Sequence, residues 1–281
     1  MPPNVPASTV REIRRDPRAK VLMVCLPDRD LCGGRLSALA EMLAPSIDVV
    51  AVEEPFADHR IGDPPMAGTA ERADRAVAAL REHRERARPL ALFGHGTGAI
   101  LAFETARRLE RERVTGPVAL FAAACRAPCR FRPDGGGDSV HGPALGDLGP
   151  AGDESSSTGP LADVLPLRAR GRRSRFSGAE CHHEAAPPRP PADPYTCGAD
   201  ARIRAGVLAF GAARDPRTRV ADVLAWREQT TGPFESRILP GGPRILQGHL
   251  PHVANAVTDF LLPVIVGDVV DLGGPEPEPL A

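Results

Sequence analysis

The chain has 281 residues, enough for one α/β domain with a substantial hydrophobic core. Hydrophobic residues make up 42% and charged residues 25%, and the net charge of −1 excludes a global basic field that would attract nucleic acid. No stretch reaches the roughly 18 apolar residues of a membrane span, and the polar N-terminus does not read as a signal peptide. We therefore expect a cytoplasmic protein that binds neither membranes nor nucleic acid.

The six cysteines are expected to be free thiols, as is usual in a cytoplasmic protein. No Gly-x-Gly-x-x-Gly fingerprint occurs in the right context, and there is no Walker sequence. The spacings of cysteine and histidine match no zinc pattern closely. The sequence thus predicts no cofactor and no metal.

Strand and helix patterns alternate along the chain. Short continuous apolar runs indicate strands that are buried on both faces, as at residues 21–26 and 207–210, and further strands are expected at residues 47–52, 90–93, 118–121 and 236–239. Apolar residues at helical spacing lie between them, at residues 36–43, 70–87, 100–113, 220–229 and 250–265. This alternation predicts an α/β fold with a mostly parallel central sheet and helices on both faces.

Composition divides the chain into ordered and low-complexity parts. Residues 20–128 and 201–266 carry the apolar periodicity and are expected to form one domain. Residues 129–200 are rich in Gly, Ser, Arg and Pro, and we expect a disordered insertion there because so few apolar groups cannot offset chain entropy. Residues 1–19 and 267–281 are expected to be a flexible lead-in and a flexible tail.

One short stretch suggests the chemistry. The apolar run 90–93 ends in Gly94-His95-Gly96-Thr97-Gly98, and a helical pattern follows at once. A strand, a sharp turn and a helix form the nucleophile elbow of α/β-hydrolases, which reads Gly-x-Ser-x-Gly. The glycines of that motif are present here, whereas Gly96 stands where the serine would be.

With its predicted strands, helices and elbow in this order, the chain resembles the type II thioesterases. These are free-standing α/β-hydrolases that edit carrier-protein thioesters in polyketide and nonribosomal peptide pathways. The resemblance covers roughly residues 20–128 and 203–262. The matching segments include Cys25-Leu26-Pro27, Leu92-Phe93-Gly94-His95, Arg126-Ala127-Pro128, Leu224-Ala225-Trp226-Arg227 and Leu239-Pro240-Gly241-Gly242. It implies an α/β-hydrolase fold whose helical lid is replaced by the insertion, and a partner that is an acyl carrier protein, a peptidyl carrier protein or a pathway synthase.

The catalytic positions of that family match poorly. The resemblance places the nucleophile at Gly96, which has no side chain to attack a thioester, and the histidine base at Pro243, which cannot accept a proton. The family's acid corresponds to Asp215. The oxyanion loop is also altered, because acidic residues occupy the stretch 28–32 where a developing negative charge would need donors.

Five residues could replace the missing groups, and the first two also have structural interpretations. Thr97 is the nearest hydroxyl, but its position suits the first turn of a helix. His95 matches a residue of the family's own elbow. His249 and His252 follow the expected base position by six and nine residues, and either could approach Asp215. Cys32 lies in the altered oxyanion loop.

The sequence therefore predicts a thioesterase-like protein of secondary-metabolite biosynthesis that lacks Ser-His-Asp hydrolysis and acts as a non-catalytic partner. One alternative is an active hydrolase or other acyl-thioester enzyme with non-standard catalytic residues. Another is a drifting gene product without function.

Overall fold

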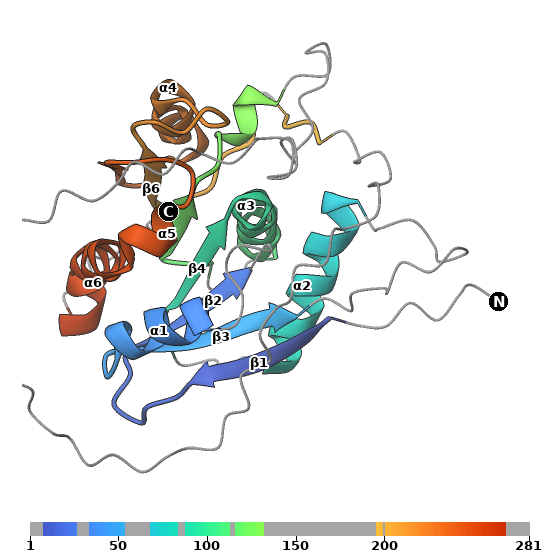
Figure 1. Ribbon diagram of the computed structural model, residues 1–281. Coiled ribbons are helices and arrows are strands. Elements are labelled where there is room, and N and C mark those ends of the chain that lie inside the picture. Colours follow the sequence, from blue (N-terminus) through green and yellow to red (C-terminus); the bar gives the residue numbers. More distant parts are fainter. Residues whose placement is uncertain are drawn as a thin grey trace, which may run out of the picture.

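The computed structural model describes residues 8–26, 34–53, 68–83, 88–112, 116–131, 195–198 and 200–267. They contain a seven-stranded sheet in the order β1-β3-β2-β4-β5-β6-β7 (Figure 1). Neighbouring strands are parallel except for β1 and β3. The strands are β1 (Thr9–Arg14), β2 (Val21–Leu26), β3 (Ile47–Glu53), β4 (Leu90–His95), β5 (Ala119–Ala123), β6 (Gly206–Ala212) and β7 (Phe234–Leu239).

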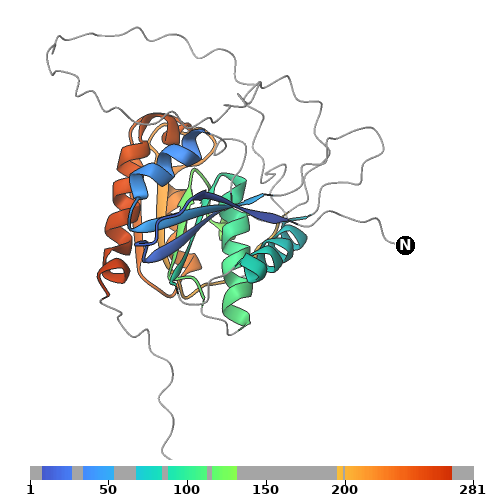
Figure 2. The same cartoon turned by 90° about the horizontal axis from the view of Figure 1, so that it is seen from below.

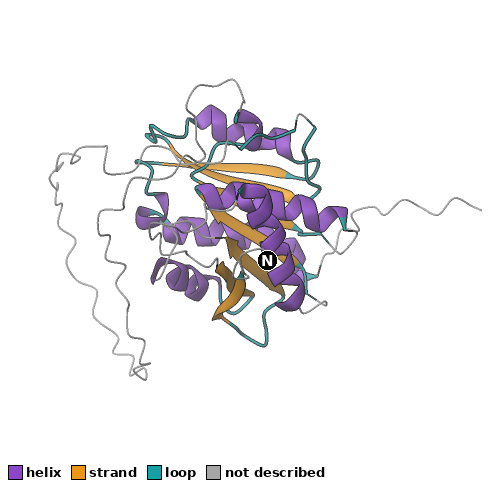
Figure 3. Cartoon of the chain, turned by 90° about the vertical axis from the view of Figure 1, so that its right-hand side faces the viewer, coloured by secondary structure: helices purple, strands orange, loops and turns teal. Residues whose placement is uncertain are grey.

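Helices cover both faces of the sheet. The core on one face includes residues of α1, α5 and α6, and the core on the other includes residues of α2, α3, α4 and η3. Figures 2 and 3 show the strands as a layer between these helices. The helices are α1 (Gly34–Leu43), α2 (Thr69–His83), α3 (Thr97–Arg111), η1 (Pro128–Arg130), α4 (Val220–Leu224), η3 (Ala225–Gln229), α5 (Ile245–Gly248) and α6 (Leu250–Val266).

The central strands explain the continuous apolar runs of the sequence. Every residue of β2, β4, β5 and β6 is buried. Successive side chains point to opposite faces, so Leu92 enters the core beneath α2 and α3 while Phe93 enters the core beneath α1 and α6. The expected α/β-hydrolase architecture, with its mostly parallel sheet, is confirmed. No helix in the described ranges is long and apolar enough to cross a membrane.

The prediction that residues 1–19 form a flexible lead-in is wrong for residues 9–14. Residues 9–14 form β1, which pairs antiparallel with β3 at the edge of the sheet. The strand carries ion pairs from Arg11 to Glu53 and from Arg14 to Glu41. Charged side chains are common on edge strands, where they discourage pairing with other chains. They also remove the apolar run that would have revealed the strand.

The borders of the expected insertion 129–200 are likewise more ordered than its composition suggested. Residues 129 and 130 belong to η1, and the ring of Phe131 meets the ring of Tyr195 edge-on at 5.6 Å between centroids. Phe131 and Tyr195, the described residues on either side of this stretch, therefore lie side by side. Residues 132–194, and the expected tail after Gly267, lie outside the described residues.

Candidate functional site

Three loops meet at the carboxyl edge of the parallel strands, where open α/β sheets generally bind their ligands. They are the elbow after β4, the loop after β6 and the turn after β7. Backbone hydrogen bonds join each to its neighbours, directly or through the end of β5. The bonds run from Gly96 N to Ala123 O, from Ala124 N to Phe210 O, from Ala213 N to Leu239 O and from Arg214 N to Gly241 O, each at 2.9 Å.

The elbow has the sharp backbone that its sequence predicts. Gly96 lies between β4 and α3 with φ 52° and ψ −123°, a region that residues with a Cβ rarely occupy. Gly94 is fixed by close packing, because a Cβ there would lie 2.3 Å from the carbonyl oxygen of Gly98 and 2.4 Å from the Cα of Ala99. The glycines of the motif therefore serve the strand-to-helix turn itself.

Thr97 is the first residue of α3, as its helix-start interpretation predicts. The amino end of this 15-residue helix carries the positive end of the helix dipole and faces the elbow. In an α/β-hydrolase the backbone N–H at this position supplies one donor of the oxyanion hole, and a loop after an early strand supplies the other. Residues 27–33, which would form that second loop and include Cys32, lie outside the described residues.

Asp215 lies in the loop after β6, and its side chain is only 1% exposed. Its Oδ1 accepts a hydrogen bond of 2.9 Å from the backbone N–H of Arg217, and the Nε of Arg217 lies 3.8 Å from the same oxygen. The carboxylate is thus held by the loop that carries it. No histidine in the described ranges bonds to it.

The turn after β7 has no group that could serve as a base at the expected position. Gly241 adopts a positive φ of 97°, and Pro243 follows two residues later without a titratable side chain. His249 is the nearest histidine in sequence. Its Nε2 lies 2.8 Å from the carbonyl oxygen of Pro240, so the ring faces the turn and does not pair with Asp215.

The other replacement candidates are placed less favourably. His95 is the last residue of β4 and only 2% exposed, which agrees with its structural interpretation. His252 stacks edge-on against His249 at 5.7 Å between ring centroids. Among the described residues, no group of three or more His, Cys, Asp or Glu side chains could hold a metal ion.

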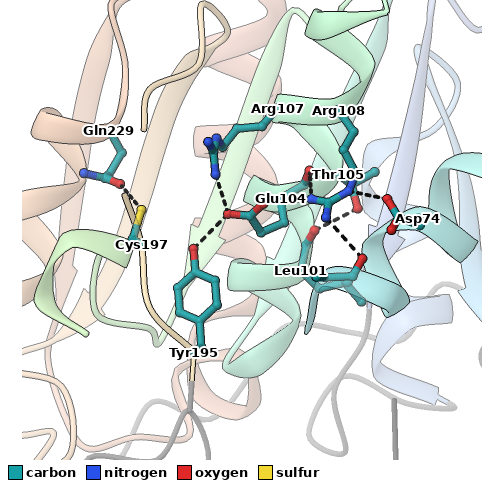
Figure 4. A network of polar contacts seen from close by, with 10 residues as sticks. Asp74, Leu101, Glu104, Thr105, Arg107, Arg108, Tyr195, Cys197 and Gln229 are labelled. Carbon is teal, nitrogen blue, oxygen red and sulfur yellow. Dashed lines mark hydrogen bonds and ion pairs between the residues drawn. The ribbon is translucent and has the colours of Figure 1, made fainter. Parts of the chain in front are cut away.

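A polar network behind the elbow is centred on Glu104 of α3. Glu104 and Arg108 are spaced to pair along α3, and Arg108 Nη1 lies 2.8 Å from Glu104 Oε2. Glu104 Oε1 also accepts bonds of 2.8 Å from Arg107 and 3.0 Å from the hydroxyl of Tyr195. Figure 4 shows Glu104 between Tyr195 and the two arginines. Tyr195 was missed because 91 residues separate it from Glu104.

The same region perturbs several ionisable groups. Burial, together with the negative charge of Glu104, raises the pKa of the Tyr195 hydroxyl well above its ordinary value. Burial and the charge of Glu228 raise the pKa of the Cys129 thiol to about 11. Burial likewise raises the pKa of Cys197. These thiols remain protonated near neutral pH, which makes them poor nucleophiles.

Comparison with known proteins gives the chain its family. A thioesterase domain model matches residues 36–261. The chain is 30% identical over 259 residues to the thioesterase PikA5 of Streptomyces venezuelae, covering 90% of this chain and 85% of the relative. It is 28% identical over 214 residues to the thioesterase TesA of Mycobacterium marinum, covering 74% of this chain and 78% of that relative.

Solved structures agree. The type II thioesterase BorB from the borrelidin biosynthetic cluster superposes with a TM-score of 0.61 and 25% identity, covering 90% of this chain and 96% of BorB. The RedJ thioesterase from the prodiginine pathway of Streptomyces coelicolor gives a TM-score of 0.59 and 25% identity, covering 86% and 88%. The chain therefore belongs to the thioesterase family of the α/β-hydrolase fold, and its relatives include type II thioesterases of polyketide and nonribosomal peptide pathways.

Proposed function

We propose that this thioesterase-family protein works in secondary-metabolite biosynthesis without hydrolysing thioesters through a Ser-His-Asp triad. Its role is that of a non-catalytic partner that binds a carrier protein. The observation that carries the proposal is the elbow at Gly96, where the sharp backbone of a nucleophile elbow holds a residue without a side chain.

The chemistry of thioester hydrolysis explains why this loss is decisive. A covalent route needs a nucleophile that attacks the acyl carbon and a base that takes its proton and returns it to the leaving thiol. Gly96 and Pro243 stand where the family resemblance places those two groups, and neither can do the work. Asp215 remains, but its carboxylate accepts the backbone N–H of Arg217 and thereby serves the loop.

A second candidate function, an acyl-thioester enzyme with a different catalytic set, draws on one observation. The ring of His249 faces the Pro240 carbonyl in the turn that would carry the base. Such an enzyme would use His249 to activate a water molecule and would need no serine. This route lacks the covalent step that makes the family's reaction efficient, so it is the weaker of the two candidates.

One experiment separates these candidates. An acyl carrier protein loaded with a radiolabelled acetyl group is captured on the immobilised chain, and the acyl group on the carrier is followed by intact-protein mass spectrometry. We expect the carrier to be retained with its acyl group intact. Acyl loss that disappears in His249→Gln would establish the second candidate, and failure to retain any carrier would overturn the partner role.

A restored variant tests whether only side chains have been lost. Gly96→Ser combined with Pro243→His returns both missing groups to the expected backbone positions. Hydrolysis that appears in the double variant and vanishes on further Asp215→Ala change would support the assignment of these three positions. If the double variant folds but stays inactive, the site lacks more than its nucleophile and base.

A further inference from the structure

The last strand of the sheet, β7, has an open edge. It pairs with β6 on one side, and no described strand lies on its other side. None of its six residues is buried, whereas every residue of the neighbouring β6 is. Ile238 of β7 is 37% exposed, and Leu224 of α4, which packs beside the strand, is 45% exposed. This edge therefore combines open backbone groups with apolar side chains, a combination that favours pairing with another strand.

Backbone hydrogen bonds show which groups of β7 face this open edge. The carbonyl oxygens of Pro233 and Leu239 accept bonds of 2.8 Å and 2.9 Å from the backbone of β6 and of the loop that follows it. Successive residues of a strand direct their N–H and C=O groups to alternate sides, so the odd-numbered residues face β6. The outward groups belong to Phe234, Ser236 and Ile238. The carbonyl oxygen of Ser236 accepts a bond of 3.1 Å from the guanidinium of Arg237, as an outward-facing group can.

The side chains of β7 are complementary to those of the same strand run in reverse. The segment Phe-Glu-Ser-Arg-Ile has an apolar residue at each end and opposite charges on either side of its central serine. Antiparallel pairing about Ser236 places Glu235 opposite Arg237 of the partner subunit. The two central serines then form a hydrogen-bonded pair, as their outward backbone groups require. The charged residues fall in non-hydrogen-bonded pairs, where opposing side chains come closest.

Charge also selects this register over its neighbours. The smallest slide that keeps the outward backbone groups paired is two residues. A slide in one direction places Glu235 opposite Glu235 of the partner subunit, and a slide in the other does the same for Arg237. Like charges directly opposite each other destabilise a strand pair, so the centred register is the favoured one.

The other edge of the sheet is built differently. The pairing of β1 with β3 shifts register between Glu12 and Arg14, and such an irregularity bends an edge away from further pairing. Two arginines of β1 are also held by carboxylates of β3 and α1. On β7 the ion pair of Glu235 with Arg237, at 2.7 Å, lies within the strand, and both side chains are 46% exposed. These two charges therefore remain accessible to opposite charges on a second strand.

From this pattern we propose that two copies of this chain associate through β7, antiparallel about Ser236, into one continuous sheet. The pairing satisfies the outward backbone groups and covers the exposed side chain of Ile238. The strands of the two copies run in opposite directions, so the carboxyl edges that carry the two elbows face opposite ways. Each copy thus keeps its candidate site open, and the inference stands independently of the proposed function.

The test compares charge variants by sedimentation velocity over about a hundredfold range of protein concentration, which gives the dissociation constant of the dimer. Arg237→Glu places carboxylate opposite carboxylate at both symmetry-related positions. The double variant Glu235→Arg, Arg237→Glu restores opposite charges there with their order reversed, and it has the net charge of the wild type. The control is Arg11→Glu, which makes the same change in charge at an exposed ion pair on the other edge strand. Circular dichroism verifies that each variant is folded.

We expect the wild type to form a reversible dimer and Arg237→Glu to raise its dissociation constant about tenfold, because the two-fold axis applies the change twice. The double variant should return to within about threefold of the wild type, and the control should stay within about twofold. A wild type that remains monomeric over the whole range overturns the proposal. A dimer that Arg237→Glu leaves unaffected also overturns it, since another surface then holds the two copies together. A double variant as weak as the single one would show that these charges do not face each other, and would overturn the proposed pairing.

Discussion

The elbow and the turn after β7 are two parts of one candidate site, and they differ in how tightly packing constrains their glycines. Both hold a glycine at positive φ, Gly96 at 52° and Gly241 at 97°. The elbow is also locked by packing, since Gly94 touches the backbone of the following helix. A Cβ on Gly241 would lie 4.0 Å from its nearest neighbouring atom, the Nε2 of His249. The elbow is thus required by the fold, whereas the turn has room to change.

Under the proposed function, this difference explains how the hydrolase scaffold would persist without its catalytic groups. The close approach of α3 to β4 needs glycines whether or not a serine stands between them. Gly96 and Pro243, the positions that the family resemblance assigns to the nucleophile and the base, are only partly buried. A sequence can therefore lose both reactive groups and still fold into the sheet, helices and elbow that the family shares.

The largest expected effect comes from filling the contact that locks the elbow. Gly94→Ala places a methyl group 2.3 Å from the Gly98 carbonyl oxygen, and only a shift of the backbone can relieve the clash. We expect a loss of about 3 kcal/mol or more in the free energy of unfolding, measured by urea denaturation.

The matched control for this change is Gly248→Ala, where an added Cβ meets nothing within 4 Å. It lies at the end of α5, so it should be neutral or stabilise by up to about 1 kcal/mol. An elbow variant as stable as this control would mean that the elbow is not locked by packing.

Strain without a clash should cost less. Gly96→Ala and Gly241→Ala each force a residue with a Cβ into a positive-φ conformation, and we expect each to lose about 1–2 kcal/mol of stability. Circular dichroism during thermal unfolding measures both. A loss at Gly241 that exceeds the loss at Gly94 would reverse the comparison between turn and elbow.

A smaller effect is expected behind the elbow. Tyr195→Phe removes the 3.0 Å bond to Glu104 and should cost about 1 kcal/mol near neutral pH. Because the folded state raises the pKa of Tyr195, and that of Cys129 from 9.0 to about 11, the unfolded chain loses these protons first as the pH rises. Stability should therefore fall above about pH 9, and this fall should be shallower in Tyr195→Phe. Equal slopes in the two proteins would contradict the assigned burial of the hydroxyl.

The sequence predicted the parallel strands and the elbow because both are encoded locally. Continuous apolar runs identify β2, β4 and β6, and the glycine spacing identifies the turn into α3. The edge strand β1 was not predicted because its charged side chains hide the alternation of apolar and polar residues. Its position depends on pairing with β3, which lies more than 30 residues further along the chain.

The residue types at the proposed catalytic positions could be read from the sequence, whereas the contacts of the site could not. Gly96 and Pro243 can be read from the motif, and the retained Asp215 follows from the same resemblance. The hydrogen bond from the Arg217 backbone N–H to the Asp215 carboxylate and the approach of His249 to the Pro240 carbonyl both depend on how the loops fold and meet. Local patterns carry no information about such long-range geometry.

Thiol release from acetyl- and propionyl-pantetheine tests the central claim most directly. The assay compares wild-type protein, Asp215→Ala and buffer over several hours at pH 7.5. The account predicts that all three rates coincide, because the elbow holds glycine and the base position holds proline. Wild-type turnover that is lost in Asp215→Ala would show a working catalytic site and contradict the account.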